Sequence, residues 1–229
     1  MDVSFALTDP ENIKTRSRRA SDPTNAAAPR HEESAGFRFF DRSAHTDDLA
    51  GNLPHWRQTE VVYFVTFRLT DALPAEKTRS WNAERARWLA DHPEPRTPML
   101  EAEFHRRFTA RMNAWLDAGH GSCVLRDPQA RTIVEDTLRR FDGPRYRLGG
   151  HVVMPNHVHA LVAPAAGHAL SGILHTWKSF TAHEINGLLG RTGPLWQKES
   201  FDHIVRSPGQ LERIEEYIRL NPTGGRPPK

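Results

Sequence analysis

The sequence predicts an α+β protein with a ferredoxin-like antiparallel sheet whose helices cover one face. Three observations support this fold class. The run VVYFVTFRL at 61–69 is typical of a buried strand. The turn-forming triplet Met154-Pro155-Asn156 separates two apolar runs, which indicates a β-hairpin. Helical patterns precede and follow this hairpin, and strand, helix, hairpin, helix, strand is the ferredoxin-like order.

The first strand at 61–69 marks the expected start of the folded domain. Residues 1–50 are rich in Ala, Ser, Pro, Arg and Asp and show little periodicity. Such a composition predicts a disordered leader. We therefore expect a leader at 1–50, one folded domain at 51–222 and a short tail at 223–229.

Four further segments show helical patterns. Two of them, at 76–91 and 101–118, are split by a proline-rich stretch at 93–98. A third begins at Asp127-Pro128 and runs to about 141, where Asp-Gly-Pro stops it. The fourth covers 170–189 and is followed by a short strand at 201–205 and a final helix.

Composition limits the range of functions without selecting one. Lys and Arg total 31 against 28 for Asp and Glu, so the net charge of +3 argues against coating of DNA by bulk charge. Only five of these cations are lysines, and arginine suits forked phosphate contacts and stacking on unpaired bases. The single cysteine, Cys123, excludes an internal disulfide, and no apolar leader predicts secretion or membrane insertion. We expect a cytoplasmic protein.

Two histidines share one face of the second hairpin strand. Side chains alternate along a strand, so His157, His159 and Leu161 lie on the same face. Two residues along a strand span roughly 6.6 Å, which two flexible imidazoles can close onto one ion. Neutral imidazole is the commonest protein metal ligand, and its other nitrogen stays free for a partner that sets the tautomer. The pair is therefore either a joint metal site or two polar residues on a solvent-exposed face.

The final helix, from Ser207-Pro208 to Pro222, carries a tyrosine and an asparagine. Its buried stripe is predicted from apolar residues at helical spacing. Tyr217 lies beside this stripe, and Asn221 lies one turn further along the same face. The pattern indicates either a phenol and an amide that act together or a core-edge aromatic followed by a C-terminal cap. The apolar stripe consists of Leu211, Ile214 and Ile218.

Together these motifs resemble the REP-associated tyrosine transposases, a branch of the single-tyrosine HUH nucleases. Their order and spacing fit over roughly 53–222. The matching text is Val152-Val153-Met154-Pro155-Asn156-His157-Val158-His159 with the apolar run to Val162, then Leu195-Trp196-Gln197, Phe201-Asp202-His203-Ile204, and Tyr217-Ile218 ahead of Asn221-Pro222.

The resemblance implies a metal-dependent endonuclease and strand transferase that acts on single-stranded DNA near a hairpin. At the matched positions, His157 and His159 bind the metal, and Asn221 completes the metal site from the tyrosine helix. Tyr217 is the matched nucleophile, which displaces a sugar 3′ oxygen and becomes joined to the 5′ phosphate. No nucleotide cofactor is expected, and the sequence contains no G-x-x-x-x-G-K-[ST] loop.

The metal, the base and the DNA contacts are less firmly specified. Two imidazoles and an amide oxygen suit zinc or manganese, whereas the resemblance implies Mg²⁺ or Mn²⁺, which we take as the expectation. The ion itself, a bound water, Lys178 or Arg219 must favour the phenolate, since tyrosine is mostly neutral at pH 7. Trp177 and Lys178, together with Arg219, are the preferred DNA contacts, although most tryptophans pack in cores.

The chain departs from the resemblance in three places. The helical patterns within 71–127 exceed what short members of the family contain, and we expect a helical insertion after the first strand. It either extends the DNA surface or covers a sheet edge. Gly149-Gly150 is expected to weaken strand pairing beside the site. The tail is shorter than usual, so we expect the tyrosine helix to be loosely held.

One alternative function stays open. A histidine-triad nucleotide hydrolase needs a third histidine where Leu161 stands, and a cupin needs an all-β chain, so both are excluded. The remaining alternative is a DNA hairpin-binding protein that keeps the fold and does not cut. Neither the recognised bases nor the choice between monomer and homodimer follows from the sequence.

Overall fold

The computed structural model describes residues 33–34, 36–41, 47–49, 55–58, 60–93 and 96–221. Most of the predicted leader and the whole tail at 223–229 lie outside these residues. The described part of the leader corrects the prediction that 1–50 is disordered. Phe37 and Phe39 are only 4% and 1% exposed and pack in a core cluster with Phe64 and Leu161. The folded domain therefore includes chain that precedes position 51.

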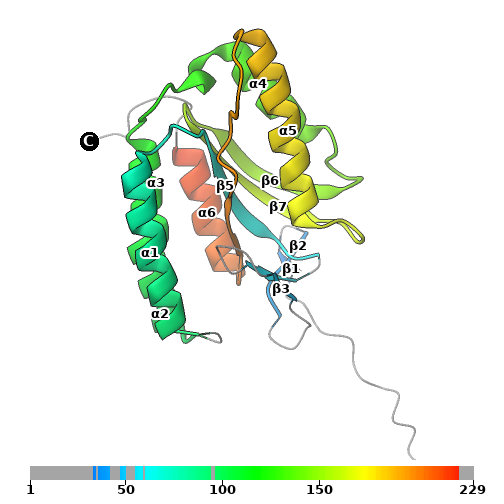
Figure 1. Ribbon diagram of the computed structural model, residues 1–229. Helices are drawn as coiled ribbons and strands as arrows, with labels where there is room; N and C mark the ends of the chain where they lie inside the picture. The colour runs from blue at the N-terminus through cyan, green and yellow to red at the C-terminus, as the bar shows by residue number, and fades with distance from the viewer. Residues whose placement is uncertain are drawn as a thin grey trace, which may run out of the picture. The chain divides into compact units, whose positions relative to one another are not determined.

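The main sheet has the predicted ferredoxin-like topology (Figure 1). Its strand order is β6-β7-β5-β8, and all three neighbouring pairs are antiparallel. In chain order the strands are β5 (Tyr63–Arg68), β6 (Tyr146–Val153), β7 (His157–Pro164) and β8 (Phe201–Ile204). Two short antiparallel pairs precede them in the chain, β1 (Glu33–Ser34) with β2 (Phe37–Arg38) and β3 (Asp47–Leu49) with β4 (His55–Arg57).

Helices α4 (Pro128–Arg139) and α5 (Leu170–Leu188) lie on one side of this sheet, and α6 (Pro208–Leu220) lies on the other (Figure 1). The predicted start signals set two of these helices. The Asp127 side chain accepts from the backbone N–H groups of Gln129 and Ala130, and the Ser207 side chain accepts from that of Gln210. A proline follows each cap in the first turn.

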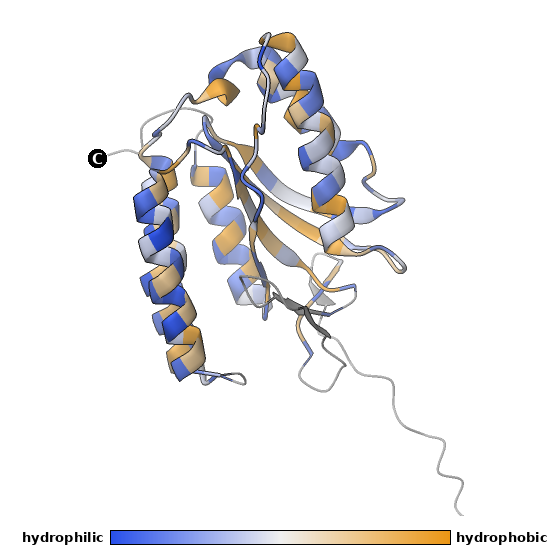
Figure 2. Ribbon diagram, in the orientation of Figure 1, coloured by the Kyte–Doolittle hydropathy of each residue, from blue (hydrophilic) through white to orange (hydrophobic). Residues whose placement is uncertain are grey.

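Strand β7 is buried along its whole length, because it packs against helices on both faces. Val158, Ala160 and Val162 belong to the core on the α4 and α5 side. Leu161 belongs to the second core with the apolar stripe of α6. Figure 2 shows the hydrophobic colouring of the sheet strands between the mixed surfaces of the helices. This second core fixes α6 over the histidine face. The α6 stripe is the predicted one, Leu211, Ile214 and Ile218.

The chain between β5 and α4 forms the expected helical insertion. It contains α1 (Ala75–Asp91), α2 (Pro98–Phe104), the π-helical turn η1 (His105–Thr109), α3 (Ala110–Asp117) and the 3₁₀ turn η2 (Val124–Arg126). Helices α1 and α3 lie on the same side of the sheet as α6 (Figure 1). Their inner side is closed by large buried side chains, among them Trp81, Trp88, Phe108, Met112 and Leu116.

The two glycines in β6 disturb the ladder as predicted. The register between β6 and β7 shifts between Leu148 and His151. A Cβ atom added to Gly149 would lie 2.9 Å from Leu161 Cβ and 3.0 Å from the ring of Phe37. The glycine is thus needed for close packing. Within the described chain, no helix has the length and apolar character needed to cross a membrane.

Candidate metal and tyrosine site

The two histidines of β7 point their Nε2 atoms at each other. His157 Nε2 and His159 Nε2 are 3.0 Å apart, and both side chains are fully buried. The turn before β7 places His157, because its Nδ1 lies 2.7 Å from Asn156 Oδ1. The neighbouring strand β5 places His159, because its Nδ1 lies 2.8 Å from Thr66 Oγ1. The ring pair is therefore held from both outer nitrogens.

The partners of Asn156 determine the tautomer of His157. Asn156 Nδ2 donates to the carbonyl of His120, so its Oδ1 faces His157 and can only accept. His157 therefore carries its proton on Nδ1 and a lone pair on Nε2. Thr66 can donate or accept, which allows His159 either tautomer. With its proton on Nδ1, His159 also presents a lone pair to the space between the rings.

Both imidazoles are neutral over a wide pH range. Burial lowers the pKa of His159 to about 3. Burial also lowers the pKa of His157 well below its usual value, and the neighbouring His159 lowers it further. Neutral imidazole is the form that binds a cation.

Helix α6 brings Tyr217 to this pair. Tyr217 Oη lies 3.1 Å from His159 Nε2. The ring stands edge-on to Phe64 with centroids 6.4 Å apart, which fixes the phenol beside β5. Burial raises the pKa of Tyr217, and the nearby Asp117 carboxylate raises it further. The phenol is therefore neutral at pH 7 in the absence of a cation.

The insertion contributes a carboxylate that the sequence analysis missed. Asp117, the last residue of α3, places Oδ1 3.6 Å from His157 Nε2. Ligand atoms of Asp117, His157 and His159 all lie within 4.8 Å of one another. Burial raises the pKa of Asp117, while the adjacent Asn221 amide and Tyr217 hydroxyl lower it. No local motif marks Asp117, because only the tertiary packing of α3 brings it to the histidines.

This cluster fits a divalent cation by its unsatisfied atoms. Asp117 Oδ1 and Asn221 Nδ2 are buried and have no hydrogen-bond partner among the described residues. A buried acceptor without a donor is costly, and a cation removes that cost. Two ligand atoms about 2.1 Å from one ion and at right angles lie roughly 3.0 Å apart. The two Nε2 atoms have this separation.

Asn221 lies where the cap interpretation expected it, at the C-terminal end of α6. Its backbone N–H donates to the Tyr217 carbonyl at 3.0 Å. Its side chain lies beside Asp117. Arg219 is exposed and forms a 3.5 Å ion pair with Glu216 on the same helix.

The prediction that Trp177 contacts DNA is wrong. Trp177 is 1% exposed in the core between α5 and the sheet, on the face opposite the histidines. Its Nε1 donates to Tyr146 Oη, so the indole is fully used by packing. Lys178 is partly buried and its Nζ donates to the carbonyl of Lys198 and to Ser200 Oγ. Burial lowers the pKa of Lys178 to about 8.

A groove of about 1280 Å³ runs between the insertion, β8 and α6. Tyr217 and Asp117 line it, so it opens onto the site. Of its acidic residues, Glu101 is bound by Arg96 at 3.0 Å and Arg206 at 3.4 Å. We call this the arginine groove, after its five arginines, Arg85, Arg96, Arg106, Arg206 and Arg213, which face the three acids Glu101, Asp117 and Asp202.

Comparison with known proteins found two similar solved structures. The first is a REP-associated tyrosine transposase bound to a REP hairpin, with 14% sequence identity and a TM-score of 0.32. The match covers 70% of this chain and 66% of that one. The second is a candidate transposase from Deinococcus radiodurans, with 14% identity, a TM-score of 0.33, and coverage of 72% and 92%. No family model and no curated protein matches the chain.

Both structures are transposases. They belong to the class of protein that the sequence motifs resemble. At this identity and TM-score the two structures carry no argument about activity, so the function is argued from the residues of this chain.

Proposed function

We propose that the protein is a metal-dependent DNA endonuclease and strand transferase with Tyr217 as its nucleophile. The observation that carries this proposal is the 3.1 Å distance from Tyr217 Oη to His159 Nε2, within a cluster that fits a cation. A nucleophile and a cation site must meet at one phosphate, and few other arrangements of these residues require that contact.

His157 and His159 are the proposed metal ligands from the sheet. Asp117 adds a carboxylate oxygen, and Asn221 supplies an amide from the tyrosine helix. A carboxylate is the ligand type that magnesium and manganese prefer, which favours Mg²⁺ or Mn²⁺ over zinc. When bound, the ion supplies positive charge that polarises the scissile phosphodiester. Thr66 and Asn156 hold the outer ring nitrogens and so orient both imidazoles.

Tyr217 Oη attacks the phosphorus, so that a new P–O bond forms to the phenol and the bond to the sugar 3′ oxygen breaks. The phenolic proton passes to the neighbouring Asp117 carboxylate, and the departing 3′ oxygen takes up a proton in turn. One phosphoester replaces another, so the energy of the bond is kept for rejoining. Attack by a 3′ hydroxyl reverses the sequence and releases Tyr217.

The arginine groove supports DNA as the substrate. Arginine side chains there outnumber acids, and Glu101 is already paired with two of them. Arg106 and Arg213 form no ion pair within the described part of the chain. Forked guanidinium groups fit phosphate oxygens, and Phe104 and Phe201 in the same walls can stack bases. Lys178 and Arg219 remain proposed DNA contacts outside the groove, and the hairpin rests on the motif resemblance.

The test is covalent capture. A 5′-labelled hairpin oligonucleotide with a single-stranded flank is incubated with the protein and Mn²⁺, and adducts are resolved on a denaturing gel. We expect a phosphotyrosine adduct that mass spectrometry places at Tyr217. Tyr217→Phe should abolish it and leave binding intact. The matched control is Tyr146→Phe, a buried tyrosine on the other side of the sheet. An adduct that survives Tyr217→Phe contradicts the proposal.

A non-cutting DNA-binding protein is the second candidate, and the orphan amide of Asn221 and raised pKa of Tyr217 favour it. Tight hairpin binding without an adduct in Mg²⁺ or Mn²⁺ would support this second candidate.

A further inference from the structure

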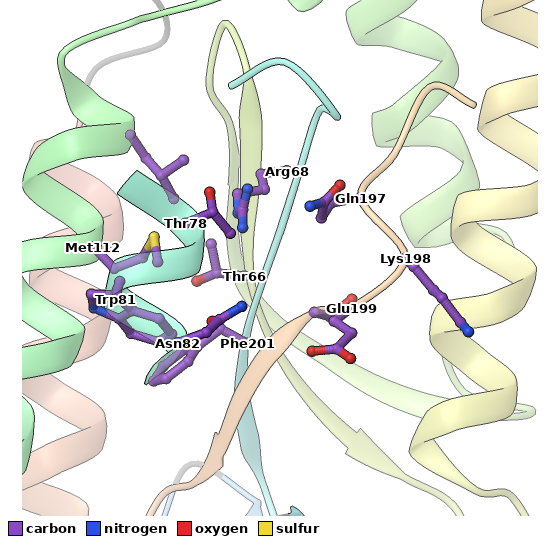
Figure 3. Close-up of a pocket in the computed structure, with 12 residues that line it drawn as sticks. Thr66, Arg68, Thr78, Trp81, Asn82, Met112, Gln197, Lys198, Glu199 and Phe201 are labelled. Atoms are coloured by element: carbon purple, nitrogen blue, oxygen red, sulfur yellow. The ribbon is translucent and has the colours of Figure 1, made fainter. Parts of the chain in front are cut away.

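A separate cavity of about 250 Å³ lies between the insertion and the turn that follows α5. Its apolar wall comes mainly from α1 and α3, and its polar wall from the end of β5 and residues 197–200 (Figure 3). The apolar wall consists of Trp81, Met112, Leu116 and Phe201, and the polar groups are those of Thr66, Arg68, Thr78, Asn82, Gln197, Glu199 and Ser200.

This cavity adjoins the histidine pair. Thr66 lines it and contacts His159 Nδ1 at 2.8 Å through Oγ1. Arg68 lines it and is the cross-strand partner of His157. A ligand here would lie one strand away from the proposed scissile phosphate. The cavity is too small for a duplex and is shaped for a single flat group against rings.

Two donors on the cavity wall have no acceptor. Arg68 Nη1 is buried and has no hydrogen-bond partner, and the same holds for Trp81 Nε1, among the described residues. Buried donors of this kind are normally paired, so their vacancy indicates a ligand that brings acceptors. Lys198 does not fill this role, since Figure 3 shows its side chain directed away from the cavity.

The cavity also contains one acidic acceptor. Glu199 lines it and interacts electrostatically with Arg68, yet the two form no ion pair within the described residues. The ligand must therefore present acceptors to a guanidinium and donors to a carboxylate. Guanine does both, because O6 and N7 accept and N1–H and N2–H₂ donate. Adenine, cytosine and thymine lack this combination of two acceptors and two adjacent donors.

We infer that the cavity binds one unpaired guanine of the DNA strand, with Arg68 on its acceptors and Glu199 on its donors. Trp81 and Phe201 provide the aromatic wall on which the base lies. The inference rests on the proposed function, because it specifies which base flanks the site of attack. It also gives the insertion a role in recognition.

The test uses mononucleotides, so that it requires neither the metal nor Tyr217. Dissociation constants of the four 2′-deoxynucleoside 5′-monophosphates are measured by tryptophan fluorescence and calorimetry. We expect dGMP to bind at least tenfold more tightly than the other three. Deoxyinosine monophosphate, which lacks N2, should bind several-fold more weakly than dGMP. Equal binding of all four, or no binding at millimolar concentration, overturns the inference.

Two variants assign the contacts. Glu199→Gln should weaken dGMP at least tenfold and remove the difference between dGMP and the inosine analogue. Arg68→Met should weaken both guanine and inosine, which share O6 and N7. The matched controls are Glu184→Gln and Arg87→Met, at exposed positions on α5 and α1. Thermal unfolding of each variant checks folding. Retention of the dGMP preference in Glu199→Gln contradicts the assignment.

The two proposals fail separately. If dGMP binds as expected and no covalent adduct forms, the nuclease proposal fails and the guanine site stands. If the adduct forms at Tyr217 and no base is preferred, only the guanine site fails.

Discussion

The two faces of the sheet treat buried polar groups in opposite ways. On the α4 and α5 face, Trp177 Nε1 donates to Tyr146 Oη, which in turn donates to the Leu138 carbonyl. On the α6 and insertion face, Asp117 Oδ1 and His203 Nε2 are buried without partners. An unsatisfied buried polar group costs about 1–3 kcal/mol, so the second face is a thermodynamic burden that the first must offset. Satisfied polar groups mark the stabilising face, and orphaned ones mark the face that binds.

The largest expected effect follows from removing a ligand on the binding face. His159→Ala should weaken Mn²⁺ binding about a thousandfold, roughly 4 kcal/mol, because one of few strong ligands is lost. Calorimetric titration with Mn²⁺ measures it. His175→Ala, on the partly exposed surface of α5, is the control. Unchanged affinity in His159→Ala would show that the ion binds elsewhere.

On the stabilising face the expected effect is on folding alone. Ile185, which is fully buried, contacts the core beneath α5. Ile185→Ala should lower the free energy of unfolding by about 3 kcal/mol through the cavity it leaves. Urea unfolding measures this loss, and Mn²⁺ affinity should stay within twofold of the wild type. A large loss of metal affinity in a variant that remains folded would break the comparison between the faces.

A pH effect should separate the faces as well. Burial lowers the pKa of His203 to about 4, against about 6.5 in the unfolded chain. Between these values the unfolded state binds the extra proton, so stability is present above about pH 6.5 and falls as pH drops toward 4. At pH 5 the loss from His203 is about 2 kcal/mol relative to pH 7.

His203→Gln should remove that part of the acid sensitivity. Urea unfolding of the wild type and of His203→Gln at pH 7 and pH 5 measures the difference, with His168→Gln, an exposed histidine, as control. An identical loss of stability in the wild type and His203→Gln would contradict the assignment.

The smallest effect is expected at the surface of α6. Arg219 is exposed and pairs with Glu216, so a phosphate contact from it is screened by solvent. Arg219→Ala should weaken binding of a hairpin oligonucleotide only two- to fivefold at low salt. Arg213→Ala, in the arginine groove, should weaken it more. A larger loss for Arg219→Ala would move the main DNA track out of the groove.

Local patterns carried most of the fold. The hairpin, the capped helices and the buried stripe of α6 depend on turn residues, caps and periodicity, and all are confirmed. Trp177 was misassigned although its own helix contained the signal. Its spacing from other buried residues of α5 is helical, which predicts packing. The core residues with that spacing are Leu170, Ile173, Leu174, Trp177, Thr181 and Ile185.

Other features had no local signal. Asp117 ends a helix forty residues before the histidines, and only the packing of the insertion brings it to His157. Phe37 and Phe39 lie in a polar stretch, so their two-residue alternation against the sheet was too short to distinguish from a leader. Long-range placement of this kind depends on tertiary contacts, which one sequence does not encode at a recognisable spacing.

The central claim is that one divalent cation binds between the two imidazoles, next to the phenol of α6. Anomalous diffraction from crystals soaked in Mn²⁺ locates that ion directly. The account predicts a single strong peak within bonding distance of His157 Nε2, His159 Nε2 and an Asp117 oxygen, with Tyr217 Oη a few ångströms away. A peak elsewhere, or rings that turn apart to leave the space between them empty, would contradict it.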